Sequence, residues 1–268
     1  MKTLKKYRIA HGHHFRLADV DPDDHGSFGG ESDALHETEA LVRKLNPLQE
    51  RLYAEGKRSL LIILQALDTG GKDGTIRHVM RELNPQGCQV TSFKLPTPDE
   101  RAHDFLWRIH AHVPARGMIG IFNRSHYEDV LVTRVHREIT AEEARERFGE
   151  INDFERMLVQ NGTQIVKFYL SISKAEQKRR LQARLDDPQK RWKFSTGDLH
   201  ERRYWNRYPS ICSEAISATS SEHAPWYVIP ANHKWYRNFL VAKVIVRTLE
   251  KMDPRIPSIR RARHIHIR

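Results

Sequence analysis

Residues 59–75 constrain the fold of this chain more strongly than any other segment. The aliphatic run 60–64 is typical of a strand that is buried on both faces of a parallel sheet. A glycine-rich turn follows at 69–74, and apolar residues then recur at helical spacing as far as Leu83. Strand, glycine turn, lysine and helix form the plan of a phosphate-binding loop, because glycines let backbone N–H groups face an anion and the helix N-terminus adds positive charge.

The turn departs from the usual loop pattern, G-x-x-x-x-G-K-[ST], at two positions. Ala66 stands where the first glycine is usual, and Asp73 follows Lys72 in place of a serine or threonine. Glycines that only relieve backbone strain would produce a similar pattern, but the spacing from Asp68 to Lys72 and a second motif downstream favour phosphate binding. The predicted phosphate-binding residues of the turn are Thr69, Gly70, Gly71, Lys72, Asp73, Gly74 and Thr75.

Asp68 precedes the lysine of this turn by four residues. A carboxylate repels phosphates unless a cation lies between them, so we expect Asp68 to hold Mg²⁺ directly or through a water molecule. The alternative is an aspartate that caps the following helix and takes no part in chemistry.

The charge balance narrows the class of partner. The 268 residues include 45 Lys and Arg against 34 Asp and Glu, a net charge of +11, which favours nucleic acid, an anionic membrane or a phosphate-rich substrate. Cys88 and Cys212 lie far apart and form no metal-binding set, which indicates reduced packing thiols. No apolar leader follows Met1 and no apolar run reaches the length of a membrane span, so we predict a soluble cytoplasmic protein with no membrane partner.

Strands and helices are expected to alternate along the chain. The predicted strands are 60–64, 88–93, 117–123, 164–172 and 226–229. The predicted helices are 31–56 (with a break or kink at Pro47), the helix after the glycine turn, 99–113, 141–160, 174–185, 199–218 and 235–252. This order predicts one α/β domain over 31–252, with a mostly parallel sheet between two layers of helices. Outside it we expect an N-terminal arm at 1–30 and a basic tail at 253–268, and within it an irregular basic loop at 186–198.

A second polar motif follows the third predicted strand, at residues 123–128. The carboxyl ends of parallel strands meet at one edge of a sheet, so this motif is expected beside the glycine turn. Many P-loop enzymes place a magnesium-binding aspartate here, whereas this chain has Asn123, with Glu128 close enough to replace the lost carboxylate. Arg124 would bind phosphate oxygens through two parallel hydrogen bonds, and a surface salt bridge is the alternative.

Three motifs in this order resemble the polyphosphate kinase 2 family. They lie at 66–73, at 122–128 and, in two pieces, at 176–181 and 187–193, and the likeness extends from about residue 30 to 252. The resemblance implies a thymidylate-kinase-like P-loop fold with a helical lid, an inorganic polyphosphate donor, and Mg²⁺, with Mn²⁺ as a substitute. It also implies a homo-oligomer, either a dimer or a tetramer.

The pairing of Asn123 with Glu128 resembles the third class of this family, whose members phosphorylate AMP as well as ADP. Carried over by position, the resemblance implies catalytic roles for Asp68, Lys72, Arg124 and Arg134, and metal binding by Asp68, Asn123 and Glu128. It implies further phosphate binding by the cations of a lid at about 174–198, namely Arg179, Arg180, Lys190 and Lys193. The predicted nucleotide-binding residues are Arg77, Asn84, Phe93, Lys94, Asn123, Ser125, Tyr127 and Glu128, and for the first four of these packing is an equal alternative.

The expected reaction is transfer of the terminal phosphate of polyphosphate to AMP and ADP, which gives ADP and ATP. Two alternatives stay open. The same fold could use ATP as the donor to another small acceptor. A basic nucleic-acid-binding protein would also explain the net charge, but the chain shows no motif that reads nucleic acid, so we expect no specific nucleic-acid partner.

Overall fold

A five-stranded sheet with the order β2-β3-β1-β4-β5 lies at the centre of the computed structural model, which describes residues 2–258. All four pairs of neighbouring strands are parallel. The strands are β1 (Ser59–Gln65), β2 (Cys88–Ser92), β3 (Ile119–Asn123), β4 (Thr163–Ser171) and β5 (Trp226–Pro230). The predicted parallel sheet is therefore confirmed, and β1, which leads into the glycine turn, is its central strand.

The aliphatic run of β1 explains its central position. Every residue of this strand is buried, and β3 and β4 flank it on either side. The run 60–64 has no polar side chain and is stable only when both faces and both edges of the strand are covered, since exposed apolar area costs roughly 25 cal/mol per Å².

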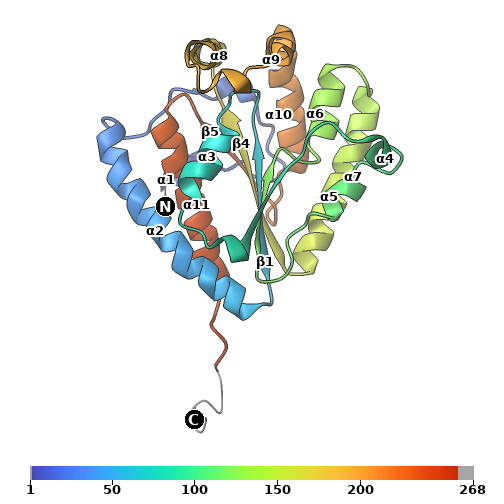
Figure 1. The fold of residues 1–268 in the computed structure, drawn as a ribbon. Helices are drawn as coiled ribbons and strands as arrows, with labels where there is room; N and C mark the ends of the chain where they lie inside the picture. The colour runs from blue at the N-terminus through green and yellow to red at the C-terminus, as the bar shows by residue number, and fades with distance from the viewer. Residues whose placement is uncertain (1, 259–268) are drawn as a thin grey trace.

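Helices cover both faces of the sheet (Figure 1). One layer consists of α1 (Lys2–Tyr7), α2 (Glu31–Glu55), α3 (Lys72–Val79) and α11 (Lys234–Met252). The other contains α4 (Pro98–Arg101), α5 (Trp107–His110), α6 (Glu128–Val135), α7 (Ala141–Gln160) and α10 (Tyr208–Thr219). Two further helices, α8 (Lys174–Asp186) and α9 (Thr196–Glu201), lie above the carboxyl edge of the sheet. The predicted three-layer α/β/α arrangement is confirmed.

Two of the predicted helices in the first half of the chain differ from the structure. The helix α2 continues through Pro47 without a break, because its buried face, which includes Leu45 and Leu52, holds it against the sheet. No single helix spans 99–113. Thr97 and Glu100 form a capping box that starts the short α4, and Asp104 then accepts a hydrogen bond from the backbone N–H of Leu106, which starts a turn before α5.

Three further differences lie beside the sheet's carboxyl edge. The helix after the glycine turn, α3, ends at Val79, earlier than predicted. The helix α6 was not predicted at all. The segment 186–198 is not irregular throughout, because α9 begins at Thr196, and the predicted helix 199–218 is divided by a 3-10 helix at Arg202–Arg207. Pro209 lies in the first turn of α10, where its missing N–H costs no hydrogen bond, and this favours a helix that begins at Tyr208.

The N-terminal arm packs against the edge of the sheet. Arg8 forms an antiparallel bridge with Tyr227 of β5, and the backbone N–H of Phe15 donates to Ser217 of α10 at 3.0 Å. The arm also carries the helix α1, which its polar sequence did not predict. Most of the predicted basic tail, residues 259–268, lies outside the described residues.

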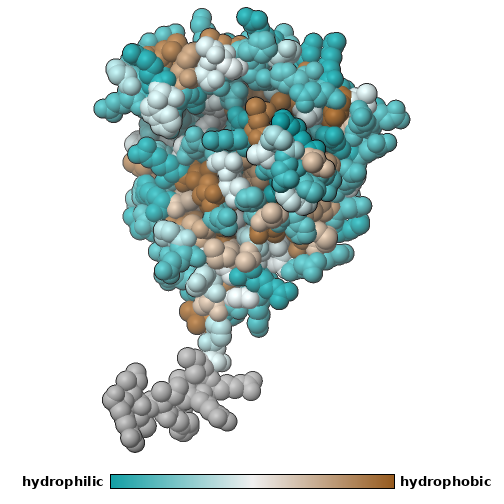
Figure 2. All heavy atoms as spheres, turned by 45° about the vertical axis from the view of Figure 1, so that its right-hand side comes forward, coloured by the Kyte–Doolittle hydropathy of each residue, from teal (hydrophilic) through white to brown (hydrophobic). Residues whose placement is uncertain are grey.

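The surface is strongly polar. The mean hydropathy of the chain is -0.66, and Figure 2 shows apolar residues only in patches between polar ones on the face that it presents. Within residues 2–258, none of the helices combines the length and the apolar composition that crossing a membrane requires.

Candidate active site

The phosphate loop joins β1 to α3 and has the backbone of an anion-binding turn. Thr69 and Gly71 have φ values of 61° and 107°, so the chain turns sharply between the strand and the first turn of the helix. Lys72 begins α3 and is 8% exposed. Its Nζ donates to the carbonyl of Ala66 at 2.7 Å, and its side chain therefore folds back along the loop.

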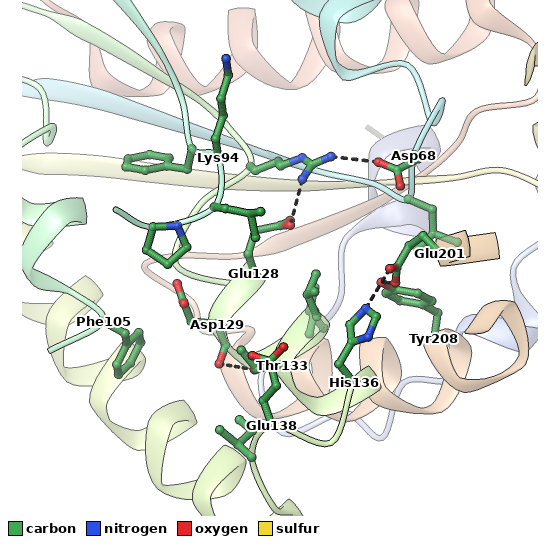
Figure 3. Close-up of a pocket in the computed structure, with 18 of the residues that line it drawn as sticks. Asp68, Lys94, Phe105, Glu128, Asp129, Thr133, His136, Glu138, Glu201 and Tyr208 are labelled. Atoms are coloured by element: carbon green, nitrogen blue, oxygen red, sulfur yellow. Dashed lines mark hydrogen bonds and ion pairs between the residues drawn. The ribbon is translucent and has the colours of Figure 1, made fainter. Parts of the chain in front are cut away.

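Arg124 joins the loop to the second motif. One terminal nitrogen of its guanidinium donates to Oδ1 of Asp68 at 2.9 Å, and the other lies 3.5 Å from Oε2 of Glu128 (Figure 3). Arg124 follows β3 with a φ of 66°, and its backbone N–H donates to the carbonyl of Leu64 on β1. The parallel register places the ends of β1 and β3 side by side, and this brings Asp68, Arg124 and Glu128 together as predicted.

The charges in this cluster depend on one another. Burial lowers the pKa of Lys72, and the nearby Arg124 lowers it further, while Glu128 and Asp68 partly oppose both effects. Burial raises the pKa of Glu128 above the usual range of a carboxyl group, although Arg124 and Lys72 counteract that rise. For Arg124, burial disfavours the charged form, but the two carboxylates outweigh it and raise the pKa. Two cations and two anions thus share a partly buried cleft, in which the side chain of Arg124 is 39% exposed.

The donor atoms of the cluster fit a magnesium ion. Mg²⁺ is usually bound in phosphoryl-transfer sites by one or two carboxylates together with substrate phosphates and water. Asp68 and Glu128 supply two such carboxylates from opposite sides of Arg124. Asn123, the third predicted ligand, points elsewhere, because its Nδ2 donates to Oδ1 of Asp73 at 2.8 Å. Within residues 2–258 no group of three or more His, Cys, Asp and Glu residues is arranged as a metal site.

A cavity of about 1290 Å³ opens from this cluster toward the layer that contains α4, α5 and α6. Asp68, Arg124 and Glu128 line one part of it, and Phe105 and Glu138 lie further away (Figure 3). Phe93 and Lys94, predicted from the end of β2, also line the wall. The ring of Phe93 is held edge-on against Phe122 at 4.9 Å between centroids. The volume is more than sufficient for a nucleotide.

Four predicted residues are separated from this cavity by the fold. Asn84 precedes β2 and lies at the amino edge of the sheet, where its backbone exchanges two hydrogen bonds of 2.8 Å with Gln49. Arg77 projects from α3 into solvent, and Arg134, in the last turn of α6, does not line the cavity. Tyr127 is fully buried.

Tyr127 and Ser125 support the second motif from beneath. The hydroxyl of Tyr127 donates to Oε1 of Glu155 at 2.9 Å, and Oγ of Ser125 accepts from Gln65 and from the backbone N–H of Tyr127, both at 3.2 Å. Neither side chain is exposed. Both residues therefore stabilise the fold beneath the second motif, whereas the sequence predicts that they contact the nucleotide.

The predicted lid cations occupy two kinds of environment. Arg180 is 8% exposed, and its guanidinium donates to Glu176 at 2.6 Å and to the loop carbonyls of Thr69 and Gly70 at 3.0 and 3.1 Å. It therefore supports the loop from the α8 side and does not face solvent. Three others are exposed: Arg179 pairs with Glu176, Lys190 with Asp187, and Lys193 lies against the ring of Trp192.

Four of the cavity residues that the sequence reasoning missed lie in or beside α9: His136, Asp198, Glu201 and Tyr208. Nε2 of His136, at the end of α6, lies 2.8 Å from Oε2 of Glu201, and the hydroxyl of Tyr208 donates to the same carboxylate. Asp198 of α9 pairs with Arg184 of α8 at 3.2 Å. All of these pairs join α9 to neighbouring elements, and His136 and Glu201 lie 65 residues apart, so no local pattern could reveal them.

Known proteins resemble this chain in sequence and in structure. A sequence model described as "Polyphosphate kinase 2 (PPK2)" matches residues 30–257. An AMP/ADP-polyphosphate phosphotransferase of Meiothermus ruber is 53% identical, with 95% of this chain and 96% of the relative covered. An ADP-polyphosphate phosphotransferase of Rhodopseudomonas palustris is 43% identical, with 93% of each covered. The crystal structure of polyphosphate kinase 2 from Arthrobacter aurescens superposes with a TM-score of 0.91 at 48% identity, over 96% of this chain and 92% of that one. The chain belongs to the polyphosphate kinase 2 family.

Proposed function

We propose that this protein transfers the terminal phosphate of inorganic polyphosphate to AMP and to ADP, with Mg²⁺ bound by Asp68 and Glu128. The observation that carries this proposal is the cluster of Asp68, Arg124 and Glu128, which joins the phosphate loop to a cavity of nucleotide size. The names of the relatives support the substrates: both include polyphosphate, one also includes AMP and ADP, and the other includes ADP.

The reaction needs positioning and charge more than it needs a base. A phosphate oxygen of the acceptor, ionised at neutral pH, forms a bond to the terminal phosphorus of the chain. The bridging P–O bond then breaks, and its electron pair stays on the shortened polyphosphate. Lys72 and the N–H groups of the loop would bind the chain, and Arg124 would orient the transferred group between donor and acceptor. Mg²⁺, when bound, would neutralise charge on the phosphate oxygens.

A donor and acceptor screen tests the proposal. The purified protein would be incubated with Mg²⁺ and either polyphosphate or ATP, crossed with AMP, ADP, GMP and GDP, and the products separated by chromatography. We expect polyphosphate with AMP to yield ADP and then ATP. Phosphate transfer from ATP to these acceptors, with none from polyphosphate, would favour the alternative kinase. Omission of Mg²⁺ is expected to abolish product formation.

Glu128 is expected to set the acid limb of the pH profile. Because burial raises the pKa of this carboxyl, it takes up a proton at a higher pH than an ordinary glutamate, and protonation removes the negative charge that faces Arg124 and the metal. Activity should therefore fall as the pH drops through this raised pKa. The measurement is kcat/KM against pH for the wild type and for Glu128→Gln.

The Glu128→Gln variant is expected to be slower at neutral pH and to lack that acid limb. Glu142→Gln is the matched control, since Glu142 is an exposed glutamate at the start of α7. An acid limb at the same position in Glu128→Gln as in the wild type would show that another group controls it.

Two other expectations stay predictions. The family resemblance predicts assembly into a dimer or tetramer. The sequence predicts a cytoplasmic location. Sedimentation of the purified protein measures the first.

A further inference from the structure

A buried arginine without a carboxylate partner lies behind the phosphate loop. Arg237, in the first turn of α11, is 2% exposed. Its Nε and one terminal nitrogen donate to Oδ1 of Asn238 at 3.2 and 2.8 Å. Among the carboxylates of residues 2–258, none forms an ion pair with it. A buried charge without a counter-charge is expensive, and removal of such a charge is often neutral or stabilising.

The guanidinium of Arg237 lies directly against the loop backbone. A Cβ atom built on Gly71 would lie 2.0 Å from Nη1 of Arg237, and one built on Gly74 would lie 3.5 Å from its Nη2. Gly71 also has a φ of 107°, which side chains rarely adopt. The absence of a side chain at Gly71 therefore allows a cation from α11 to reach the backbone at the start of α3.

A second buried arginine differs from Arg237 in one respect. Arg180 of α8 also contacts the loop, where its Nη1 lies 3.5 Å from the position of a Gly71 Cβ, but Glu176 neutralises its charge. Arg237 has no such partner, and burial lowers its pKa, with the charge of Arg180 lowering it further. Arginine nevertheless stays protonated in proteins, so the ligand-free protein carries the cost of this charge.

We propose that Arg237 is a positioning residue for the phosphate chain: it supports the loop at Gly71 and keeps there a positive charge that a bound phosphate chain neutralises. This inference rests on the proposed function, because it takes inorganic polyphosphate as the donor. Arg237 acts on the bound phosphate chain in two ways: it holds the loop backbone in place, and its positive charge attracts the chain. Arg237 does not line the cavity beside Asp68, Arg124 and Glu128.

The test compares Arg237→Met with Arg247→Met, an exposed arginine further along the same helix. Thermal unfolding is measured without ligand and with tripolyphosphate, and KM is measured for polyphosphate and for ADP. For Arg237→Met we expect an unfolding temperature without ligand that is equal to or above that of the wild type. We also expect loss of most of the stabilisation by tripolyphosphate, and a KM for polyphosphate raised about tenfold or more. The KM for ADP should change less than about twofold, and Arg247→Met should resemble the wild type.

A role in packing alone predicts the opposite pattern. Arg237→Met would then unfold at a lower temperature than the wild type without ligand, and tripolyphosphate would stabilise it as much as it stabilises the wild type. That pattern overturns the proposal. A variant that matches the wild type in unfolding temperature, stabilisation and KM also overturns it. Arg237→Lys keeps the charge and should retain at least half of the stabilisation. If Arg237→Met does not fold, complete loss of stabilisation in Arg237→Lys overturns the proposal instead. Because tripolyphosphate binding is measured without turnover, failure of the proposed transfer reaction in the wild type is distinguishable from failure of this inference.

Discussion

Replacing Lys72 with methionine should lower the rate of phosphoryl transfer by a factor on the order of 10³. Lys72 supplies a full positive charge at the start of α3, where the loop N–H groups supply only partial charges. Its Nζ lies 2.7 Å from the carbonyl of Ala66 and would turn toward a bound phosphate chain. Methionine has a similar length without the charge, so the variant removes the electrostatic contribution and keeps the packing.

The measurement for Lys72→Met is the initial rate of ADP formation from AMP and polyphosphate, together with the unfolding temperature. Because burial lowers the pKa of Lys72, an uncharged side chain at this position should not destabilise the fold. Lys44→Met, at an exposed position of α2, is the control and should leave the rate unchanged. A rate within about tenfold of the wild type would contradict the assignment of Lys72 to the reaction centre.

Replacing Lys167 with methionine should destabilise the protein by about 3–5 kcal/mol, because it removes the lysine charge from the buried carboxylate of Glu155 and leaves only the imidazole of His126, at 3.5 Å, as a basic group beside it. Nζ of Lys167 lies 2.5 Å from Oε2 of Glu155 and also donates to the hydroxyl of Tyr127 and to the carbonyl of Thr219. Both members of the ion pair are at most 1% exposed. Burial would raise the pKa of Glu155, but Lys167 and His126 together outweigh it and keep that pKa below its usual value.

Thermal and urea unfolding measure this effect, and we expect the unfolding temperature to fall by about 10 °C. Adding Glu155→Gln to Lys167→Met should recover part of the stability, since glutamine is uncharged and still accepts from Tyr127. Asp153→Asn, which breaks an exposed pair with Arg156 on the same helix, is the control and should cost less than about 1 kcal/mol. A loss below about 1 kcal/mol for Lys167→Met would mean that water reaches Glu155 or that the pair is not formed.

The buried pair also explains why Tyr127 was misjudged. A tyrosine beside Arg124 and Glu128 in the chain is an obvious candidate for a nucleotide contact. In the structure its ring is buried, and its hydroxyl donates a hydrogen bond to Glu155 and accepts one from Lys167. Lys167 interrupts the otherwise hydrophobic run 165–170 of β4, which indicates a buried polar partner, but the identity of that partner is not a local property.

The parallel sheet and the reaction centre follow from local sequence. An aliphatic run such as that of β1 is stable only inside a sheet, and a glycine turn before a helix binds anions wherever it occurs. Asp68, Lys72, Arg124 and Glu128 come together because each lies at or just after the carboxyl end of β1 or β3, and neighbouring parallel strands end at the same edge.

Tertiary contacts decided the positions of the remaining residues. Whether a polar side chain faces a ligand or a buried partner depends on groups that are distant in sequence: Arg180 binds loop carbonyls about 110 residues away, and His136 meets Glu201 across 65 residues. Arg237 reaches Gly71 only because α11 packs beside α3. The free energy of burying a polar group is set by the partners that surround it in the folded chain, and those partners exist only after the sheet and its helices have packed.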